Sequence, residues 1–214
     1  SNKILVSLLA TAAGQVSGVP RAAIQMIETR AEVAEMLRQE KFINLIVPRG
    51  SNAFVKYIQE NTKIPVLGHS AGICHGYIDR SGDIKKAIAL TLDAKVQYPA
   101  ACNAMETLLI HQDIAEILLP ELVKKLREKD VELLGCERTC RLAPEINKAE
   151  IADWETEYTD LKLSIKIVSS LQEAIEHINT HGSGHTDMIV TENREAAERF
   201  LNEVVDAIKK YNAQ

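Results

Sequence analysis

Segments with helical periodicity alternate with short, strand-like apolar runs along this chain. Such alternation is typical of a parallel β-sheet whose faces are covered by helices. Apolar spacing predicts helices over residues 2–13, 31–39, 53–59, 83–95, 114–129, 171–180 and 194–210. It predicts strands over residues 24–27, 43–47, 64–67, 73–78, 107–110, 131–134, 161–168 and 188–190. The sequence therefore predicts the α/β class.

The order of these elements suggests two domains, because the alternation restarts after Gly72. Residues 1–72 are interpreted as a partial dinucleotide-binding domain, about half of a doubly wound sheet. Residues 73–205 form a second α/β domain, and residues 206–214 are set apart as a tail. Ser51, Asp113 and Ser170 are predicted N-caps of the helices that follow them.

Composition excludes several classes of protein. With 214 residues and 46% hydrophobic side chains, the chain can bury one substantial core or two small ones. Its net charge is −5 and no basic run stands out, which argues against a nucleic-acid partner. It has neither a membrane-length apolar stretch nor the ordered parts of a secretory signal. We expect no membrane partner and an intracellular location.

Four cysteines stand at positions 74, 102, 136 and 140. A chain of this length and apolar content does not need a disulfide framework, so they are interpreted as reduced thiols. Cys136 and Cys140 could share one helical face, but no second pair of ligands completes a zinc site nearby. We expect no metal.

Cys102 is the candidate nucleophile. It lies in Tyr-Pro-Ala-Ala-Cys-Asn-Ala, residues 98–104, just before a strand-like run. A thiol attacks carbonyl groups best where neighbouring side chains are small and backbone N–H groups favour the thiolate. The alternative, which the spacing alone favours, is a buried cysteine that acts as a small hydrophobe.

Two glycine-containing turns are further candidates. Pro48, Arg49, Gly50 and Ser51 end a predicted strand and open a helix, where backbone N–H groups favour a phosphate; the alternative is a plain turn. Residues 68–72, Gly-His-Ser-Ala-Gly, match the nucleophile elbow of serine hydrolases, which would make Ser70 a nucleophile. An elbow needs a helix directly after it, whereas residues 73–78 are predicted as a strand.

Several blocks in order carry a family resemblance. They are IVPRGS at 46–51, IPVLGH at 64–69, GICH at 72–75, the segment 98–111 and HTDMIVTE at 185–192. The sequence resembles the γ-glutamyl phosphate reductases, also called glutamate-5-semialdehyde dehydrogenases, of the aldehyde dehydrogenase superfamily. It is also similar to the C-terminal half of bifunctional pyrroline-5-carboxylate synthases. The resemblance extends to about residue 205.

The resemblance implies a fold and a reaction. The fold would be a partial doubly wound nucleotide-binding sheet followed by an aldehyde-dehydrogenase-like α/β catalytic domain. Cys102 would attack L-glutamyl 5-phosphate, release phosphate and form a thioester, which NADPH reduces to glutamate 5-semialdehyde in proline biosynthesis. The Cys102 backbone N–H and the Asn103 side chain would stabilise the oxyanion.

The resemblance also implies cofactor contacts. Those in the first part would come from the turn at residues 48–51, together with Gly68 and His69. Glu157 would hold the nicotinamide ribose; its alternative is a solvated surface glutamate. Related dehydrogenases place a water-activating glutamate where this chain has His69 and Ser70, and its absence suits a reductase that must protect a thioester from water. The alternative for His69 is a structural histidine.

The two ends of the chain depart from the family pattern. The family's long N-terminal portion and its segments beyond residue 205 are not found in this sequence. We therefore expect a fragment of a longer parent that forms a homo-oligomer in the cytoplasm, or in the mitochondrion for a bifunctional parent. A non-catalytic remnant that binds a ligand or partner is the alternative.

Overall fold

A computed structural model describes residues 2–68, 71–204 and 208–211 and divides the chain into two units, Ser1–Ser70 and Ala71–Gln214. The α/β class is confirmed. In the first unit the elements are α1 (Asn2–Ala13), a 3-10 turn (Arg21–Ala23), α2 (Arg30–Met36) and α3 (Asn52–Glu60). The helix predicted over residues 2–13 is confirmed with both ends correct.

The core of the first unit is small. Its buried members are Leu37, Ile46, Ile58 and Ile64. One parallel bridge joins Ile46 to Val66, and the Ile46 carbonyl accepts the Leu67 N–H at 2.8 Å. The strands predicted over residues 43–47 and 64–67 are therefore reduced to this bridge, and the strand predicted over 24–27 is wrong. Two short segments with no neighbouring strand in the described part of this unit gain too few hydrogen bonds to form a sheet.

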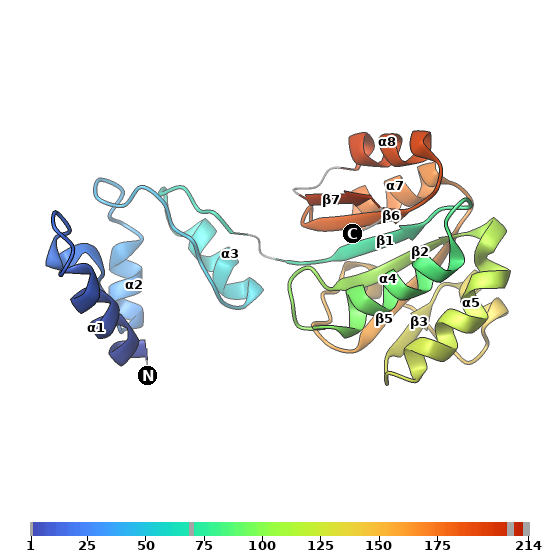
Figure 1. The fold of residues 1–214 in the computed structure, drawn as a ribbon, viewed down its shortest axis with the longest axis horizontal. Helices are drawn as coiled ribbons and strands as arrows, with labels where there is room; N and C mark the ends of the chain where they lie inside the picture. Colours follow the sequence, from blue (N-terminus) through green and yellow to red (C-terminus); the bar gives the residue numbers. More distant parts are fainter. Residues whose placement is uncertain (1, 69–70, 205–207, 212–214) are drawn as a thin grey trace. The chain divides into compact units, whose positions relative to one another are not determined.

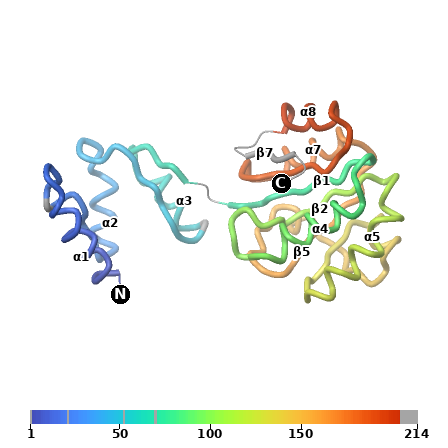
Figure 2. The backbone as a smooth tube through the Cα atoms, in the orientation of Figure 1, coloured from blue at the N-terminus to red at the C-terminus, as the bar shows by residue number. Residues whose placement is uncertain are grey.

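The second unit is built on a parallel sheet with the order β4-β3-β5-β2-β1-β6-β7. Figure 1 labels these strands except β4, and Figure 2 follows the backbone of the same unit. Its strands are β1 (Cys74–Ile78), β2 (Met105–His111), β3 (Glu132–Gly135), β4 (Asn147–Lys148), β5 (Lys162–Val168), β6 (Thr186–Val190) and β7 (Ile208–Tyr211). All seven residues of β2 are buried, so the strand buries the polar residues Glu106 and Thr107 together with the apolar run at residues 108–110.

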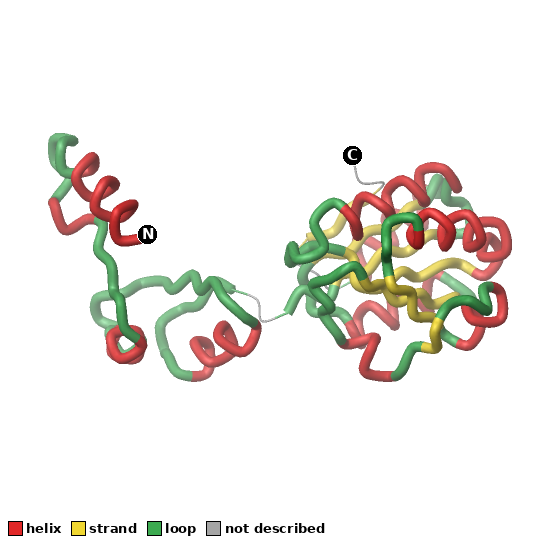
Figure 3. Tube along the Cα trace, turned by 90° about the horizontal axis from the view of Figure 1, so that it is seen from below, coloured by secondary structure: helices red, strands yellow, loops and turns green. Residues whose placement is uncertain are grey.

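Helices cover both faces of this sheet, as Figure 3 shows. They are α4 (Ile84–Val96), α5 (Gln112–Arg127), α6 (Glu137–Leu142), α7 (Leu171–His181) and α8 (Arg194–Glu203), with a 3-10 turn at Ile151–Glu155. The larger core lies between the sheet and helices α4 and α5, and a smaller core lies under α7 and α8. The three-layer arrangement follows from burying both faces of a parallel sheet.

Local signals explain several boundaries. Asp83 caps α4 by accepting the Lys86 N–H at 2.8 Å, and Ser170 caps α7 through the Glu173 N–H. The prediction that Asp113 caps α5 is wrong, because the His111 side chain is the cap and accepts the Asp113 N–H at 3.2 Å. The short elements α6 and β4 and the 3-10 turn at residues 151–155 are additional to the predicted set.

The helix predicted over residues 194–210 is confirmed at its start, Arg194, but its predicted C-terminal part is wrong. It ends at Glu203, and Val204 is already extended with φ −75° and ψ 130°. Residues Ile208–Tyr211 pair with β6 as a parallel strand. Pairing with the edge of a sheet overrides the weak helical pattern of this segment.

Candidate active site

Cys102 lies in the tight loop between α4 and β2. Hydrogen bonds from the Ala101 N–H to the Tyr98 carbonyl and from the Ala104 N–H to the Ala101 carbonyl, at 3.0 and 2.9 Å, shape the loop. Cys102 is exposed, whereas Ala104, two residues later in the loop, is buried. Exposure excludes the alternative of a buried cysteine that acts as a hydrophobe. The thiol is accessible to a substrate.

Gly72 allows the cysteine loop to pack closely on the segment that leads into β1. A Cβ atom at residue 72 would overlap the Cys102 carbonyl oxygen. The same atom would lie 2.8 Å from Oε1 of Glu157. The backbone of Cys102 and the Glu157 carboxylate therefore both lie against Gly72. Two residues that the sequence places 55 positions apart are brought to one place.

Cys74 supports the same loop from inside the fold. Its thiol donates to the Cys102 carbonyl oxygen at 3.4 Å, and its Sγ lies 3.7 Å from Nδ1 of His185. Burial, followed by the nearby charge of Asp187, raises the pKa of Cys74 to about 12. Cys74 therefore stays a neutral thiol at ordinary pH and is no competitor of Cys102 as a nucleophile.

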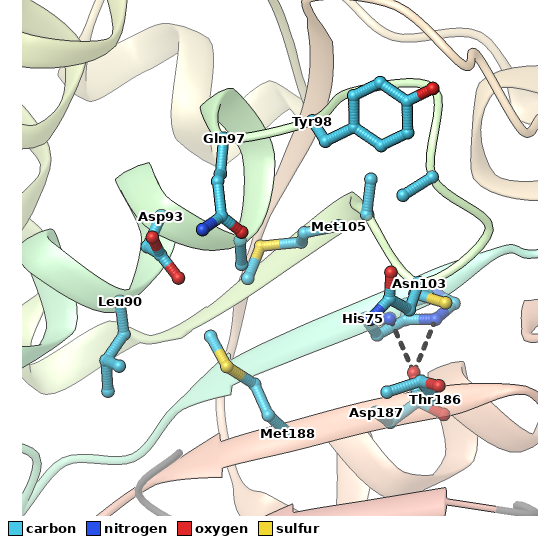
Figure 4. Close-up of a pocket in the computed structure, with 14 residues that line it drawn as sticks. His75, Leu90, Asp93, Gln97, Tyr98, Asn103, Met105, Thr186, Asp187 and Met188 are labelled. Carbon is cyan, nitrogen blue, oxygen red and sulfur yellow. Dashed lines mark hydrogen bonds and ion pairs between the residues drawn. The ribbon is translucent and has the colours of Figure 1, made fainter. Parts of the chain in front are cut away.

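Asn103 lines a cavity of about 180 Å³ beside the cysteine loop (Figure 4). The opposite wall comes from Asp93 of α4 and from Gln97, the C-cap residue of that helix, and Met105 and Met188 contribute apolar surface. The Asn103 amide can donate hydrogen bonds. Its place directly after the cysteine is compatible with the predicted role at an oxyanion, which stays a prediction.

A buried histidine–aspartate pair lies near this cavity. The Asp187 carboxylate accepts the His75 N–H at 2.5 Å, and Oδ1 is 3.3 Å from Nδ1 of the ring; Figure 4 marks both interactions. The His75 ring also meets the His177 ring edge-on, with 5.5 Å between centroids. Burial, with the charge of Lys166, lowers the pKa of His177 to about 2, so His177 is neutral. His75 and Asp187 are not among the residues predicted for the site, because their pairing depends on the neighbouring positions of β1 and β6 in the sheet.

Four of the predicted cofactor residues of the first unit, residues 48–51, form the turn before α3. Ser51 is the N-cap of α3 and accepts the Phe54 N–H at 3.4 Å. A Cβ atom at Gly50 would lie 2.8 Å from the Phe54 ring, and one at Gly68 would lie 2.9 Å from the buried Pro48. Arg49 is exposed in the same turn. The two glycines therefore let the Phe54 ring and Pro48 pack directly against the backbone.

Two predicted residues, His69 and Ser70, lie outside the described residues. The structure therefore does not test the predicted cofactor role of His69 or the alternative role of Ser70 as a hydrolase nucleophile. The element that follows Gly72 is strand β1 and not the helix that a nucleophile elbow requires.

Cys136 and Cys140 lie at the start and in the middle of α6. Cys136 is the N-cap residue, and the Cys140 thiol donates to the Gly135 carbonyl at 3.4 Å. In the described ranges, no group of three or more His, Cys, Asp or Glu residues is placed to hold a metal ion. Nor does any helix there combine the length and the apolar character needed to cross a membrane.

Comparison with known proteins defines the class. The sequence matches the aldehyde dehydrogenase family over residues 1–162, so the chain belongs to that family. Membership indicates NAD or NADP as the class of cofactor. In the first unit, the N-terminal end of the nine-residue helix α3 suits a phosphate. In the second unit, considered by itself, the half-buried carboxylate of Glu157 can accept hydrogen bonds from ribose hydroxyls.

Relatives narrow the class further. Over 184 residues the chain is 59% identical to the γ-glutamyl phosphate reductase of Nostoc sp. strain PCC 7120, which covers 86% of this chain and 42% of that protein. The crystal structure of γ-glutamyl phosphate reductase from Thermotoga maritima matches with a TM-score of 0.95 and 39% identity, over 100% of this chain and 52% of that one. A glyceraldehyde-3-phosphate dehydrogenase from Methanocaldococcus jannaschii, in complex with NADP, shares the fold with a TM-score of 0.77 and 14% identity, over 98% of this chain and 55% of that one. The chain therefore spans about half the length of these proteins.

Proposed function

We propose that this chain carries the cysteine chemistry of a γ-glutamyl phosphate reductase. The substrate would be L-glutamyl 5-phosphate, and the products glutamate 5-semialdehyde and phosphate. The observation that carries the proposal is the packing around Gly72, which holds Cys102 and Glu157 together. The reductases of Nostoc and Thermotoga maritima support the substrate, since they are 59% and 39% identical to this chain.

Cys102 would act as the nucleophile. Its exposed thiolate attacks the acyl carbon of the substrate, a C–S bond forms, and the C–O bond to phosphate breaks. The tetrahedral oxyanion is stabilised by the Cys102 backbone N–H and by the Asn103 amide; loss of one such donor typically raises the barrier by about 3 kcal/mol. The thioester is then ready for reduction.

NADPH, when bound, supplies the hydride that reduces the thioester. We propose NADP and not NAD, on the family resemblance and on the NADP complex of the Methanocaldococcus jannaschii relative. Glu157 would orient the nicotinamide ribose by accepting hydrogen bonds from its hydroxyls. The turn of Pro48, Arg49, Gly50 and Ser51, with Gly68 and His69, would contact the rest of the dinucleotide.

The reverse reaction tests this proposal. Glutamate 5-semialdehyde, phosphate and NADP should yield NADPH, which is followed by its absorbance. Cys102→Ala should abolish the phosphate-dependent rate, and Cys136→Ala is the matched control that should retain it. A Cys102→Ala protein that is folded and turns over as fast as the parent would overturn the proposal.

A further inference from the structure

A buried ion pair joins the two stems of the cysteine loop. Lys95 lies in the last turn of α4 and Glu106 lies at the start of β2, eleven residues apart, with Cys102 between them. The Lys95 Nζ donates to Oε2 of Glu106 at 2.6 Å, and the two side chains are 0% and 1% exposed. The pair thus closes the loop at its base.

The second carboxylate oxygen of Glu106 reaches another segment. Oε1 accepts the Thr159 N–H at 3.2 Å. Thr159 has φ 54°, a left-handed conformation that non-glycine residues adopt only when their surroundings hold them there. Glu157 stands two residues earlier and lies against Gly72, which in turn contacts Cys102. One carboxylate therefore links the loop of the nucleophile to the segment of Glu157.

Stability alone is a poor explanation for this pair. Both charged groups are buried away from water, and this burial lowers the pKa of Lys95 and raises the pKa of Glu106. Apolar side chains of similar size often replace a buried ion pair without loss of stability. An apolar residue at position 106, however, could not accept the Thr159 N–H.

We propose that Lys95 and Glu106 are positioning residues. Lys95 fixes the Glu106 carboxylate, and Glu106 binds the Thr159 N–H and so holds the segment that contains Glu157 at a fixed position beside the cysteine loop. The proposal rests on the proposed function for the roles of Cys102 and Glu157. The placement of Thr159 by Glu106 can be measured without substrate or cofactor.

Two double variants separate positioning from stability. Lys95→Met with Glu106→Gln, called the Gln variant, removes the buried charges but keeps an acceptor for the Thr159 N–H. Lys95→Met with Glu106→Leu, called the Leu variant, removes the charges and the acceptor. Hydrogen exchange of the Thr159 amide is the first measurement, made where both variants are fully folded. The exposed pair Lys125 and Glu121, 3.2 Å apart on α5, provides a matched control as Lys125→Met with Glu121→Leu.

The Thr159 amide should exchange at least about fivefold faster in the Leu variant than in the Gln variant, the factor expected from one lost hydrogen bond. The control variant should match the parent. Equal exchange in the Gln and Leu variants would overturn the proposal. If the Leu variant does not fold, Glu106→Asp, which draws the carboxylate back by one methylene, should speed exchange at Thr159, and unchanged exchange would overturn the proposal.

Affinity for NADPH is the second measurement. We expect the Leu variant to bind NADPH more weakly than the Gln variant at equal thermal stability, because Glu157 would no longer be held in place. A parent chain that does not bind NADPH would count against the proposed function, while Thr159 exchange would still decide the positioning role. Faster exchange at Thr159 with unchanged NADPH affinity would contradict the link to Glu157.

Discussion

The Cys102 carbonyl oxygen lies so close to Gly72 that no Cβ atom fits between them. This contact fixes the backbone of the candidate nucleophile against the segment that leads into the central strand β1. The Glu157 carboxylate lies on the same glycine. A residue with no side chain therefore sets the distance between the two groups on which the proposed chemistry depends.

Gly72→Ala should displace the cysteine loop. Forced overpacking of this kind typically costs about 1–3 kcal/mol of unfolding free energy. We also expect slower acylation of Cys102. Gly135→Ala is the matched control. A Cβ atom at residue 135 would lie 2.8 Å from the Thr139 side chain, so it is overpacked too, but its neighbours are not residues of the cysteine loop. It should lower the denaturant midpoint without changing Cys102 reactivity, and an equal change in reactivity would contradict a specific role for Gly72.

Glu157→Ala should weaken NADPH binding about tenfold or more, since hydrogen bonds to charged groups contribute about 1.5–3 kcal/mol. Fluorescence titration with NADPH measures the effect. Glu155→Ala is the control: Glu155 belongs to the same segment but its carboxylate contacts His181 at 3.2 Å. Equal losses in the two variants would contradict a ribose contact by Glu157.

Cys74 should make the protein less stable at alkaline pH. The folded thiol keeps its proton up to a pKa of about 12, whereas the thiol of the unfolded chain ionises near 8.5. Stability is therefore lost as pH rises from about 8.5 towards 12, by at most about 1.4 kcal/mol per unit. Between pH 8 and pH 10, denaturant unfolding should show that Cys74→Ala loses less unfolding free energy per pH unit than the parent. The same pH dependence in both proteins would contradict the raised pKa of Cys74.

His177 should make the protein less stable at acid pH. Burial and the charge of Lys166 hold its pKa at about 2, whereas the unfolded chain binds a proton below about 6.5. Stability is present above pH 6.5 and falls as pH drops towards 2. Between pH 6.5 and pH 5 the parent should lose up to about 2 kcal/mol more than His177→Phe. Equal losses would mean that His177 is protonated in the folded state.

The sequence predicts the second unit better than the first. Helix α4 is predicted to within one residue, because Asp83 is a strong cap and the apolar spacing is regular. Strand β1, Cys74–Ile78, falls within the strand predicted over residues 73–78. In the first unit, by contrast, strand-like runs such as residues 24–27 find no partner strand among the described residues, and strand formation depends on pairing as much as on the run itself.

The candidate site is predicted only in part. Cys102 and Glu157 follow from the family resemblance, and the structure adds that both meet Gly72. The link from Glu106 to Thr159 spans 53 residues and crosses from β2 to a turn, so no local pattern could reveal it. Contacts of this kind are set by tertiary packing and become visible only in the folded chain.

Acylation of Cys102 by L-glutamyl 5-phosphate tests the central claim most directly. The substrate can be generated in place by a glutamate kinase and ATP, and intact-protein mass spectrometry follows the chain beside Cys102→Ala. The parent should gain one glutamyl group on Cys102 and release an equal amount of phosphate, whereas the variant should do neither. A folded parent that gains no glutamyl group, or a Cys102→Ala variant that gains one equally fast, would contradict the account.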